Sequence, residues 1–343
     1  MNKLILLIVM ALTGIQSTVL AQKSAAFLPE KPGKWKFDYN IAVRNNDEIK
    51  FKDNITTLAE WFHQNLPLLT HPKGFNLWAY AAGMWDDHYQ ISDSNYGLRA
   101  ELNFNFQLFT SNGEIWTAEL PKASYYSFQI NNTQGALNYH GQFAYFNNLQ
   151  DDQKLENAIN EAASKLDDIK IGFPFKEELA PGVHLYEETP GSDRCHIVVF
   201  NPERPPYWIP VTIKELAAIY LEYYSLFQKQ EINQMILKEL KDELSRIPED
   251  ELNSPAHSGH DSNIVFRFNG RTQEGQPLVK FNPDYWDRTL PASAIQLMTF
   301  WYPRMSRKEM DEQLIRFGYP VNSQILINQI NWGDVAGLIM KGK

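Results

Sequence analysis

Residues 97–109 read GLRAELNFNFQLF, and every second side chain from Leu98 onward is apolar. This alternation is typical of a β-strand that turns one face to a core and the other face away from it. The turn Ser111-Asn112-Gly113 follows, and EIWTA at 114–118 then predicts a return strand. The segment therefore predicts an antiparallel hairpin.

The sequence around this hairpin predicts more strands and one helix. KWKFDYNIAVR at 34–44 alternates in the same way, and YYSFQI at 125–130 and QFAYF at 142–146 favour two further strands. ITTLAEWFHQNL at 55–66 has apolar residues at helical spacing. We therefore interpret residues 23–148 as a β-rich α+β region with a helix on one face of an antiparallel sheet.

Residues 149–248 are predicted to form a second α+β region. DDQKLENAINEAASKLDD at 151–168 is an amphipathic helix by its apolar spacing. GVHLYEE at 182–188 and CHIVVF at 195–200 predict a hairpin, because a Pro-Gly turn separates the two apolar runs.

A long helix is predicted near 213–247. Thr212 and Glu215 have capping-box spacing, which places the start of the helix at Ile213. One face carries Ile213, Leu216, Ala217, Tyr220, Tyr224 and Phe227, and this spacing favours packing in a core over contact with a ligand; Tyr223 lies about 100° away from Tyr224. A second apolar stripe begins at Ile232, rotated by about 100° from the first. The helix could break near 228–231, but no Gly or Pro interrupts it, so we favour one helix whose second half contacts another region.

Residues 249–262 are predicted to be a linker, and 263–343 a small α+β region. SNIVFRFNG at 262–270 and PLVKFNP at 277–283 favour a hairpin, and SAIQLMTFWY at 293–302 a buried strand. A helix follows, with the capping box Ser306–Glu309 and the stop signal Gly318, and SQILINQINW at 323–332 favours a last strand. The fold class is thus α+β, with antiparallel sheets and packed amphipathic helices.

The first 22 residues have the pattern of a signal peptide. Lys3 precedes a nine-residue apolar run, and Val19-Leu20-Ala21 suits cleavage before Gln22. We expect an exported protein, periplasmic or extracellular, with no membrane insertion after cleavage. Without Lys3 the chain has 31 basic and 41 acidic side chains, a net charge of −10. This charge argues against nucleic acid as a partner.

No common catalytic or metal motif is present. The sequence lacks a P-loop, G-x-G-x-x-G, H-E-x-x-H, G-x-S-x-G and C-x-x-C, so we expect no cofactor. The one cysteine, Cys195, lies in an apolar run and is interpreted as a core thiol. His257, His260 and Asp261 could ligate a metal, but Gly259 makes a common helix face improbable and no fourth ligand is evident, so we expect no metal site.

Two segments place carboxylates beside aromatic rings. MWDDHY at 84–89 and NPDYWDR at 282–288 each follow a predicted strand. Rings could stack on the flat faces of sugars, and carboxylates could bind their hydroxyl groups. The candidate ligand-binding residues are Trp85, Asp86, Asp87, His88, Asp284, Tyr285, Trp286 and Asp287.

The sequence leaves two classes of function open, and whether the protein is an enzyme stays undecided. The favoured hypothesis is an exported soluble protein without catalytic activity, which binds a neutral ligand (a glycan or peptide) or a protein partner through aromatic-rimmed surfaces. The alternative is a secreted hydrolase that acts on glycans with a pair of carboxylates from Asp86, Asp87, Asp284 and Asp287. Convergence of two carboxylates in one pocket would distinguish the two.

Overall fold

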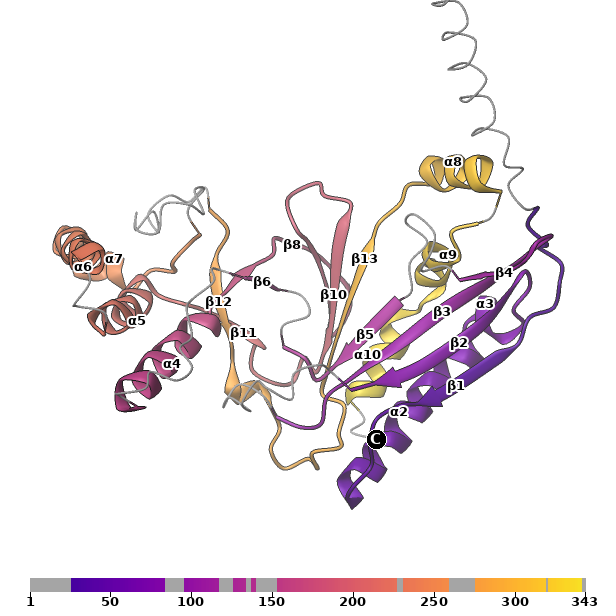
Figure 1. Ribbon diagram of the computed structural model, residues 1–343, viewed down its shortest axis with the longest axis horizontal. Helices are drawn as coiled ribbons and strands as arrows, with labels where there is room; N and C mark the ends of the chain where they lie inside the picture. Colours follow the sequence, from indigo (N-terminus) through magenta and orange to yellow (C-terminus); the bar gives the residue numbers. More distant parts are fainter. Residues whose placement is uncertain are drawn as a thin grey trace, which may run out of the picture.

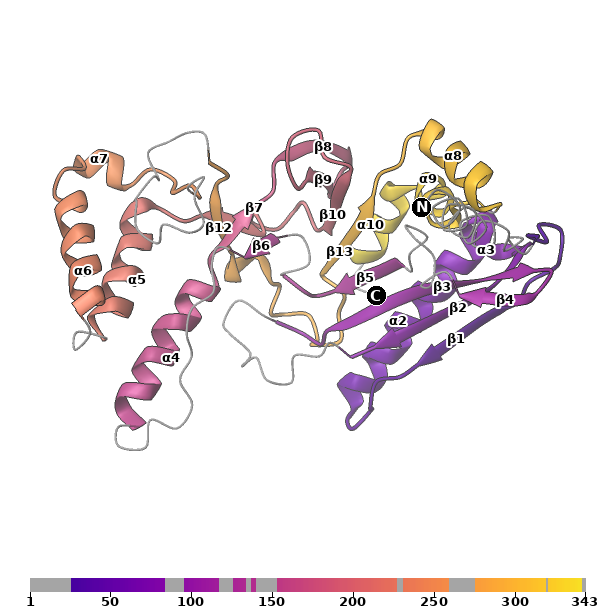
Figure 2. The ribbon, with the colours of Figure 1, turned by 45° about the horizontal axis from the view of Figure 1, so that its top comes forward.

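The computed structural model describes residues 26–83, 96–116, 126–133, 137–139, 153–226, 231–258, 275–318 and 320–340. These residues form two lobes (Figures 1 and 2), a large one built on a nine-stranded sheet and a small helical one attached through a four-stranded sheet. The fold is α+β with antiparallel sheets, which confirms the predicted class.

The large sheet brings together strands from distant parts of the chain. In spatial order it contains β1 (Trp35–Tyr39), β2 (Phe75–Ala82), β3 (Ala100–Thr110), β5 (Tyr126–Ile130), β13 (Leu297–Pro303), β10 (Arg194–Phe200), β9 (Val183–Glu187) and β8 (Phe175–Ala180), and β4 (Gly113–Trp116) pairs with β3. The neighbours are antiparallel except for β1 and β2. One sheet therefore takes strands from all three predicted regions.

The two hairpins predicted in this lobe are confirmed. Thr110 of β3 pairs with Gly113 of β4, and Gly113 has φ +123°, a backbone conformation that favours glycine. Strands β9 and β10 pair from Val183 to Glu187. The predicted strand at 34–44 is shorter, Trp35–Tyr39.

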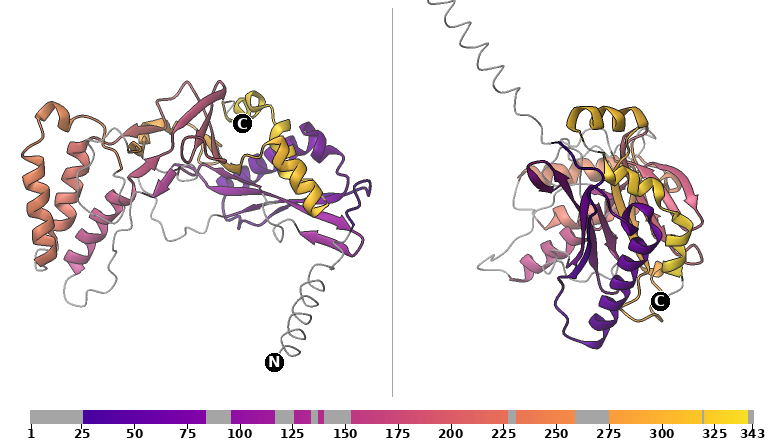
Figure 3. Two further views of the ribbon diagram at one scale, coloured as in Figure 1. Left: turned by 90° about the horizontal axis from the view of Figure 1, so that it is seen from above. Right: turned by 90° about the vertical axis from the view of Figure 1, so that its right-hand side faces the viewer.

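Helices cover one face of the large sheet (Figure 3). They are α2 (Asn46–Asn65), α3 (Pro67–Thr70), α9 (Asn322–Gln329) and α10 (Trp332–Met340). Phe62 of α2 packs with Phe104, Phe128 and Phe300 of the strands in one buried cluster. Helix α2 begins nine residues before the predicted start, because the Asn45 side chain accepts a hydrogen bond from the backbone N–H of Glu48 and caps it.

The last predicted strand, 323–332, is wrong. This segment forms α9 and the start of α10. Its apolar residues also fit helical spacing, since Leu326, Ile327 and Ile330 all pack into the core under the sheet. The short apolar run was compatible with the period of a strand and with that of a helix. It forms a helix whose apolar side packs against the large sheet.

The second sheet links the two lobes. Its order is β11 (Trp208–Pro210), β12 (Leu278–Phe281), β7 (Lys170–Gly172) and β6 (Leu137–Tyr139), and every neighbouring pair is antiparallel. Segment 277–283 does form a strand, whose described partners are β7 and β11. The partner predicted for it, 262–270, lies outside the described residues, as does the strand predicted at 142–146.

The small lobe contains α4 (Gln153–Asp167), α5 (Ile213–Ser225), α6 (Glu231–Leu244) and α7 (Glu249–Leu252). The single long helix near 213–247 is wrong: α5 ends at Ser225, and α6 packs beside it (Figure 2). Tyr220 and Leu240 belong to the same buried cluster. Because the two apolar stripes point in different directions on a straight helix, only a break lets both face one core.

The predicted helix caps are confirmed. Thr212 Oγ1 accepts a hydrogen bond from the Glu215 N–H at 3.1 Å, although the Glu215 side chain pairs with Lys280 of β12 and does not complete the box. Ser306 and Glu309 form a full capping box on α8 (Arg307–Phe317), and Gly318 ends that helix with φ +75°. In the described ranges, no helix is both long and apolar enough to cross a membrane.

Candidate functional site

The eight predicted ligand-binding residues fall into two groups. Trp85, Asp86, Asp87 and His88 lie outside the described residues. The other four, at 284–287, follow Asn282 in and after a short 3-10 helix, η3 (Pro283–Tyr285). Convergence of the two groups therefore stays a prediction.

The two rings of the second group are core residues. The side chain of Tyr285 is 0% exposed and that of Trp286 2%. The Tyr285 hydroxyl donates a hydrogen bond to the Gln296 carbonyl oxygen at 2.5 Å and accepts one from the Asn201 N–H at 3.1 Å. Neither ring presents an open face to a ligand in this structure.

The backbone of this segment and the carboxylate of Asp287 also have hydrogen-bond partners. The Arg204 guanidinium donates to the carbonyl oxygens of Asp284, Tyr285 and Trp286 at 2.9, 2.8 and 2.9 Å. The Asp287 carboxylate accepts from the hydroxyl and the N–H of Thr289, and these hydrogen bonds lower the pKa of Asp287. As placed, the segment is a closed turn fixed against the core.

A different surface combines half-buried rings with polar groups. It lies on the face of the large sheet opposite the core, on strands β1, β2 and β3. We call it the aromatic–amide face; its residues are Lys36, Asp38, Asn76, Trp78, Tyr80, Asn105 and Gln107. Side chains alternate along a strand, so Leu77, Ala79 and Ala81 of β2 point to the core and leave Trp78 and Tyr80 on this outer face.

Two rings and one ion pair form the centre of this face. The rings of Trp78 and Tyr80 lie 5.0 Å apart between centroids, at 37°. Trp78 Nε1 donates to Asp38 Oδ2 at 2.7 Å, and Lys36 Nζ lies 2.5 Å from the same oxygen. The hydrogen bond from Lys36, and next that from Trp78, holds the pKa of Asp38 below its usual value. The carboxylate is thus fixed as an anion beside the indole.

Side-chain amides surround the rings. Asn105 lies directly opposite Trp78 on the neighbouring strand, and Asn76 Nδ2 donates to Gln107 Oε1 at 3.1 Å. Asn76 Oδ1 also accepts from the Lys34 N–H at 3.0 Å, so this amide has a fixed orientation. Amide groups both donate and accept hydrogen bonds, which suits a ligand rich in hydroxyl groups.

Toward the middle of the sheet, the polar groups on this face are buried. Asn103 pairs with Ser127 across β3 and β5, and Thr299 lies on the same face of β13. Within the described chain, Ser127 Oγ and Thr299 Oγ1 are buried and have no hydrogen-bond partner. Trp301, on the same face of β13, is 42% exposed. The face therefore reaches solvent at Trp301 and, in part, on β1, β2 and β3.

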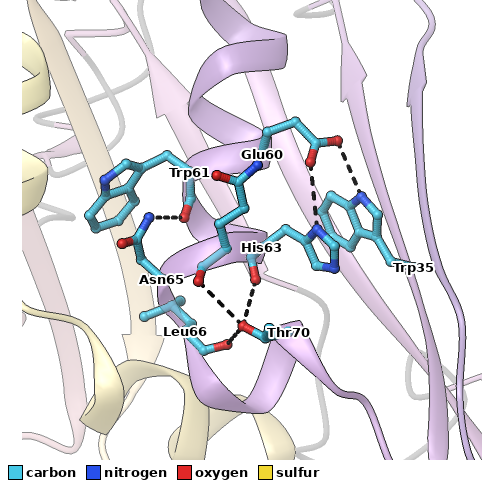
Figure 4. A network of polar contacts seen from close by, with 8 residues as sticks. Trp35, Glu60, Trp61, His63, Asn65, Leu66 and Thr70 are labelled. Carbon is cyan, nitrogen blue, oxygen red and sulfur yellow. Dashed lines mark hydrogen bonds and ion pairs between the residues drawn. The ribbon is translucent and has the colours of Figure 1, made fainter.

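A polar network on the other side of β1 holds this edge strand in place (Figure 4). The Trp35 indole stacks on the His63 imidazole of α2 at 4.4 Å and 2° between the ring planes. Trp35 Nε1 donates to Glu60 Oε1 at 3.3 Å, and Glu60 Oε2 lies 3.5 Å from His63 Nδ1. Because Trp35 and Lys36 point to opposite faces, these contacts position Lys36 and Asp38 indirectly.

The comparisons with known proteins give no further guide to the site. No protein-family model matches the chain, and neither a curated protein nor a solved structure resembles it significantly. Among the described residues, no group of three or more His, Cys, Asp or Glu side chains could hold a metal ion. His260 and Asp261, which the sequence analysis considered as metal ligands together with His257, lie outside the described residues.

The sequence did contain a signal for the aromatic–amide face. The polar positions of strand β3 are Glu101, Asn103, Asn105 and Gln107, one carboxylate followed by three amides on the side of the strand opposite the core. The apolar half of this alternation predicts the strand, and the polar half marks the outer face. The alternation could not show that Trp78 and Asp38 lie beside this run, because that depends on the pairing of β1, β2 and β3.

Proposed function

We propose that the chain is an exported, non-catalytic binding protein that holds a neutral glycan on its aromatic–amide face. One observation carries the proposal: Trp78 and Tyr80 lie side by side with amides on a sheet face that no described helix covers. Large rings supply apolar contact area at low entropic cost, and a sugar ring offers a flat C–H face to such a surface.

The charges on this face favour a neutral ligand over a charged one. Lys36 and Asp38 neutralise each other, and the other members of the face are amides and rings. The whole chain has a net charge of −9, which would oppose an anionic glycan at long range. Hydroxyl groups can satisfy the amides of Asn105 and Gln107 without a net charge.

The same geometry favours binding over hydrolysis at this face. A glycosidase needs a carboxylic acid whose pKa is raised, so that it keeps a proton near neutral pH. Asp38, the carboxylate that contacts the indole, has a lowered pKa because Lys36 and Trp78 donate hydrogen bonds to it. Asp38 therefore suits orientation of Trp78 and does not suit proton donation.

Affinity electrophoresis on a panel of soluble neutral polysaccharides tests this proposal. The expected result is retardation of the wild-type protein, with binding about tenfold weaker in Trp78→Ala, which corresponds to about 1.4 kcal/mol. Trp61→Ala is the matched control, because Trp61 is a half-buried tryptophan on helix α2 and packs against the core on the other side of the sheet.

Salt is the second variable in this experiment. Binding should change little between about 0.05 and 0.5 M NaCl, because no net charge on the face is screened. Retardation by no neutral polysaccharide, or equal losses in Trp78→Ala and Trp61→Ala, would contradict the proposal. Strong weakening by salt would point to a charged ligand instead.

Export is a separate part of the proposal. It is supported by the charged start, the apolar run and the small residues that precede Gln22. N-terminal sequencing of material from the exporting cell's medium or periplasm should begin at Gln22. Recovery of the chain with Met1 in a membrane fraction would contradict it.

A further inference from the structure

The chain passes between the two sheets repeatedly. It leaves the large sheet after β5, returns after β7, leaves again after β10 and returns after β12. The chain therefore enters the small lobe twice, and several connections join it to the large lobe (Figure 1). Relative motion of the lobes depends on the contacts where these connections meet.

Those contacts form a separate aromatic cluster, which we call the seam. Its buried members are Phe173, Tyr186, Val198, Phe200, Tyr207, Phe281, Tyr285, Trp286 and Leu297. Phe173 lies in the connection from β7 to β8, and Tyr207 in that from β10 to β11. Tyr186 and Phe200 belong to strands of the large sheet, so the seam joins the two lobes.

Two histidines border the seam: His196 of β10 stacks on Phe173 at 4.3 Å, and His184 contacts two of the seam's tyrosines. Nδ1 of His184, on strand β9, lies 2.7 Å from the Tyr207 hydroxyl, which lies 2.6 Å from the hydroxyl of Tyr186. The His184 ring packs against Phe200 at 4.4 Å and meets the exposed ring of Phe175 at 5.2 Å. His184 thus binds the large sheet to the connection that enters the small one.

We propose that His184 is an acid-sensitive latch between the lobes: protonation of its ring weakens the contact of β9 with Tyr207 and lets the small lobe move.

The hydrogen-bond chain explains why a proton has this effect. When neutral His184 carries its proton on Nε2, Tyr207 donates to Nδ1 and the Tyr186 hydroxyl can donate to Tyr207. A protonated imidazole has two donors and no acceptor, so Tyr207 must accept from Nδ1, and one of the two hydroxyl protons is left without an acceptor in this chain. The nearest polar ring, Trp208, has only a donor, and its Nε1 is itself buried without a partner among the described residues.

The groups around His184 do little to stabilise its charged form. Glu178 pairs with His184 across β8 and β9 and favours the proton, while β10 contributes the apolar Val198 and Phe200. Tyr186 and Tyr207 are the other titratable neighbours, and burial raises the pKa of each. Burial is the dominant influence on His184 and lowers its pKa despite Glu178.

The direction of the pH effect follows from that lowered pKa. The unfolded or opened chain binds a proton near pH 6.5, whereas the closed seam binds it only at lower pH. The contribution of His184 to the closed state is therefore present above about pH 6.5 and is lost as the pH falls through the folded-state pKa. Acid opens the latch, and neutral pH closes it.

Hydrogen exchange of the full chain, followed by mass spectrometry, tests the latch. Rates corrected for intrinsic exchange should rise at least about threefold from about pH 7.5 to about pH 5 in peptides covering 183–187 and 205–211. Peptides from β2 and β3 should not change, because they lie far from the seam in the large sheet. Equal opening everywhere would indicate global acid unfolding and would overturn the proposal.

Variants separate the latch from other acid effects. His184→Gln keeps a hydrogen-bond acceptor but cannot take up a proton, so its seam exchange should lose the pH response. His63→Gln is the matched control: His63 stacks on Trp35 away from the seam, and this variant should keep the response. A wild-type seam with no pH response, or an unchanged response in His184→Gln, would overturn the proposal.

A second substitution keeps the test decisive if His184→Gln does not fold. Tyr207→Phe removes the hydroxyl that binds Nδ1 and retains the ring in the seam. Its seam peptides should exchange faster at about pH 7.5, near the wild-type rate at about pH 5, and the ratio between the two pH values should fall. Wild-type rates at both pH values would overturn the latch.

Discussion

The two lobes build their cores from the sequence in opposite ways. The core of the helical lobe comes from residues 155–256 with Leu278 added, so nearly all of its contacts join neighbouring helices. The core of the large lobe joins strands near residues 35–130 with others near 183–199 and 295–302 and with the C-terminal helices. Local periodicity in the sequence therefore predicts the helical lobe well, whereas in the large lobe it predicts single strands and helices but not how they pack together.

The two cores also differ in chemistry. The large lobe buries a group of phenylalanines that pack ring on ring, such as Phe62, Phe128 and Phe300. The helical lobe buries Tyr220 and Tyr224, whose pKa values burial raises. A tyrosine core retains hydroxyl groups that need partners, so it belongs at the rim of a small lobe more than at the centre of a large one.

The largest expected effect is in the phenylalanine core. The Phe128 ring lies 4.8 Å from that of Phe62 and 4.6 Å from that of Phe300, so Phe128→Ala leaves a cavity between a strand and a helix. We expect a loss of about 3–5 kcal/mol in the free energy of unfolding, measured with urea. Phe175→Ala is the control: its side chain is 57% exposed, and the loss should stay below about 1 kcal/mol. Similar losses of stability in both variants would contradict the expected difference between the buried Phe128 and the exposed Phe175.

The next effect tests whether the helical lobe has one core. Tyr220 of α5 and Leu240 of α6 lie in the same cluster, so each alanine substitution should cost about 2–5 kcal/mol. The double variant should deviate from the sum of the two by at least about 0.5 kcal/mol, because the helices pack against each other. Strict additivity in urea unfolding would show that the two side chains have separate surroundings.

The same pair of residues shows what the sequence could predict. The helical character of both stripes, the cap at Thr212 and the burial of the tyrosine stripe were evident from spacing and residue type. The break after Ser225 was not, because Leu226 ends α5 by donating its N–H to Tyr223 and Tyr224 carbonyl oxygens, without a Gly or Pro. The rotation between the two stripes was the only sign, and it was compatible with two arrangements.

The candidate site was harder to predict than the fold class. The pattern of rings beside carboxylates predicted a ligand site at 284–287, but the structure places Tyr285 and Trp286 in the seam. The aromatic–amide face depends on β1 lying parallel to β2 with Asp38 opposite Tyr80, a pairing that no local pattern encodes. Sequence periodicity assigns a residue to a face of its strand, and only strand order shows which residues share that surface.

Helix caps give the third prediction and compare a packed helix with an exposed one. Thr212→Ala removes the hydrogen bond to the Glu215 N–H at the start of α5 and should cost about 1 kcal/mol. Ser306→Ala removes the corresponding bond on α8, where Ile315 is 84% exposed. Because α8 can fray without opening a core, its variant should lose less than about 0.5 kcal/mol in global unfolding. A larger loss in Ser306→Ala than in Thr212→Ala would mean that α8 is more tightly packed than the structure shows.

The smallest expected effect is in an ion pair on the surface of the helical lobe. Lys165 Nζ of α4 lies 2.8 Å from Glu222 Oε1 of α5 and 3.3 Å from Glu161 Oε1 of its own helix. The hydrogen bond to Glu222 is the main reason that the pKa of Lys165 is raised. Its contribution is therefore present below the unfolded pKa of about 10.4 and is lost as the pH rises through the folded-state value.

Double-mutant cycles compare the Lys165–Glu222 pair, which joins two helices, with the Lys165–Glu161 pair within α4. Lys165→Met combined with Glu222→Gln should give a coupling of about 0.2–1 kcal/mol at low salt, because the side chains of both residues are 40% exposed or more. The control cycle, Lys165→Met with Glu161→Gln, should give about 0.3–0.5 kcal/mol. Both couplings should fall toward zero in about 1 M NaCl. A coupling to Glu222 that persists in salt would mean that α4 and α5 are joined by a shielded ion pair, and the helical lobe would then depend on charge as well as on its tyrosine core.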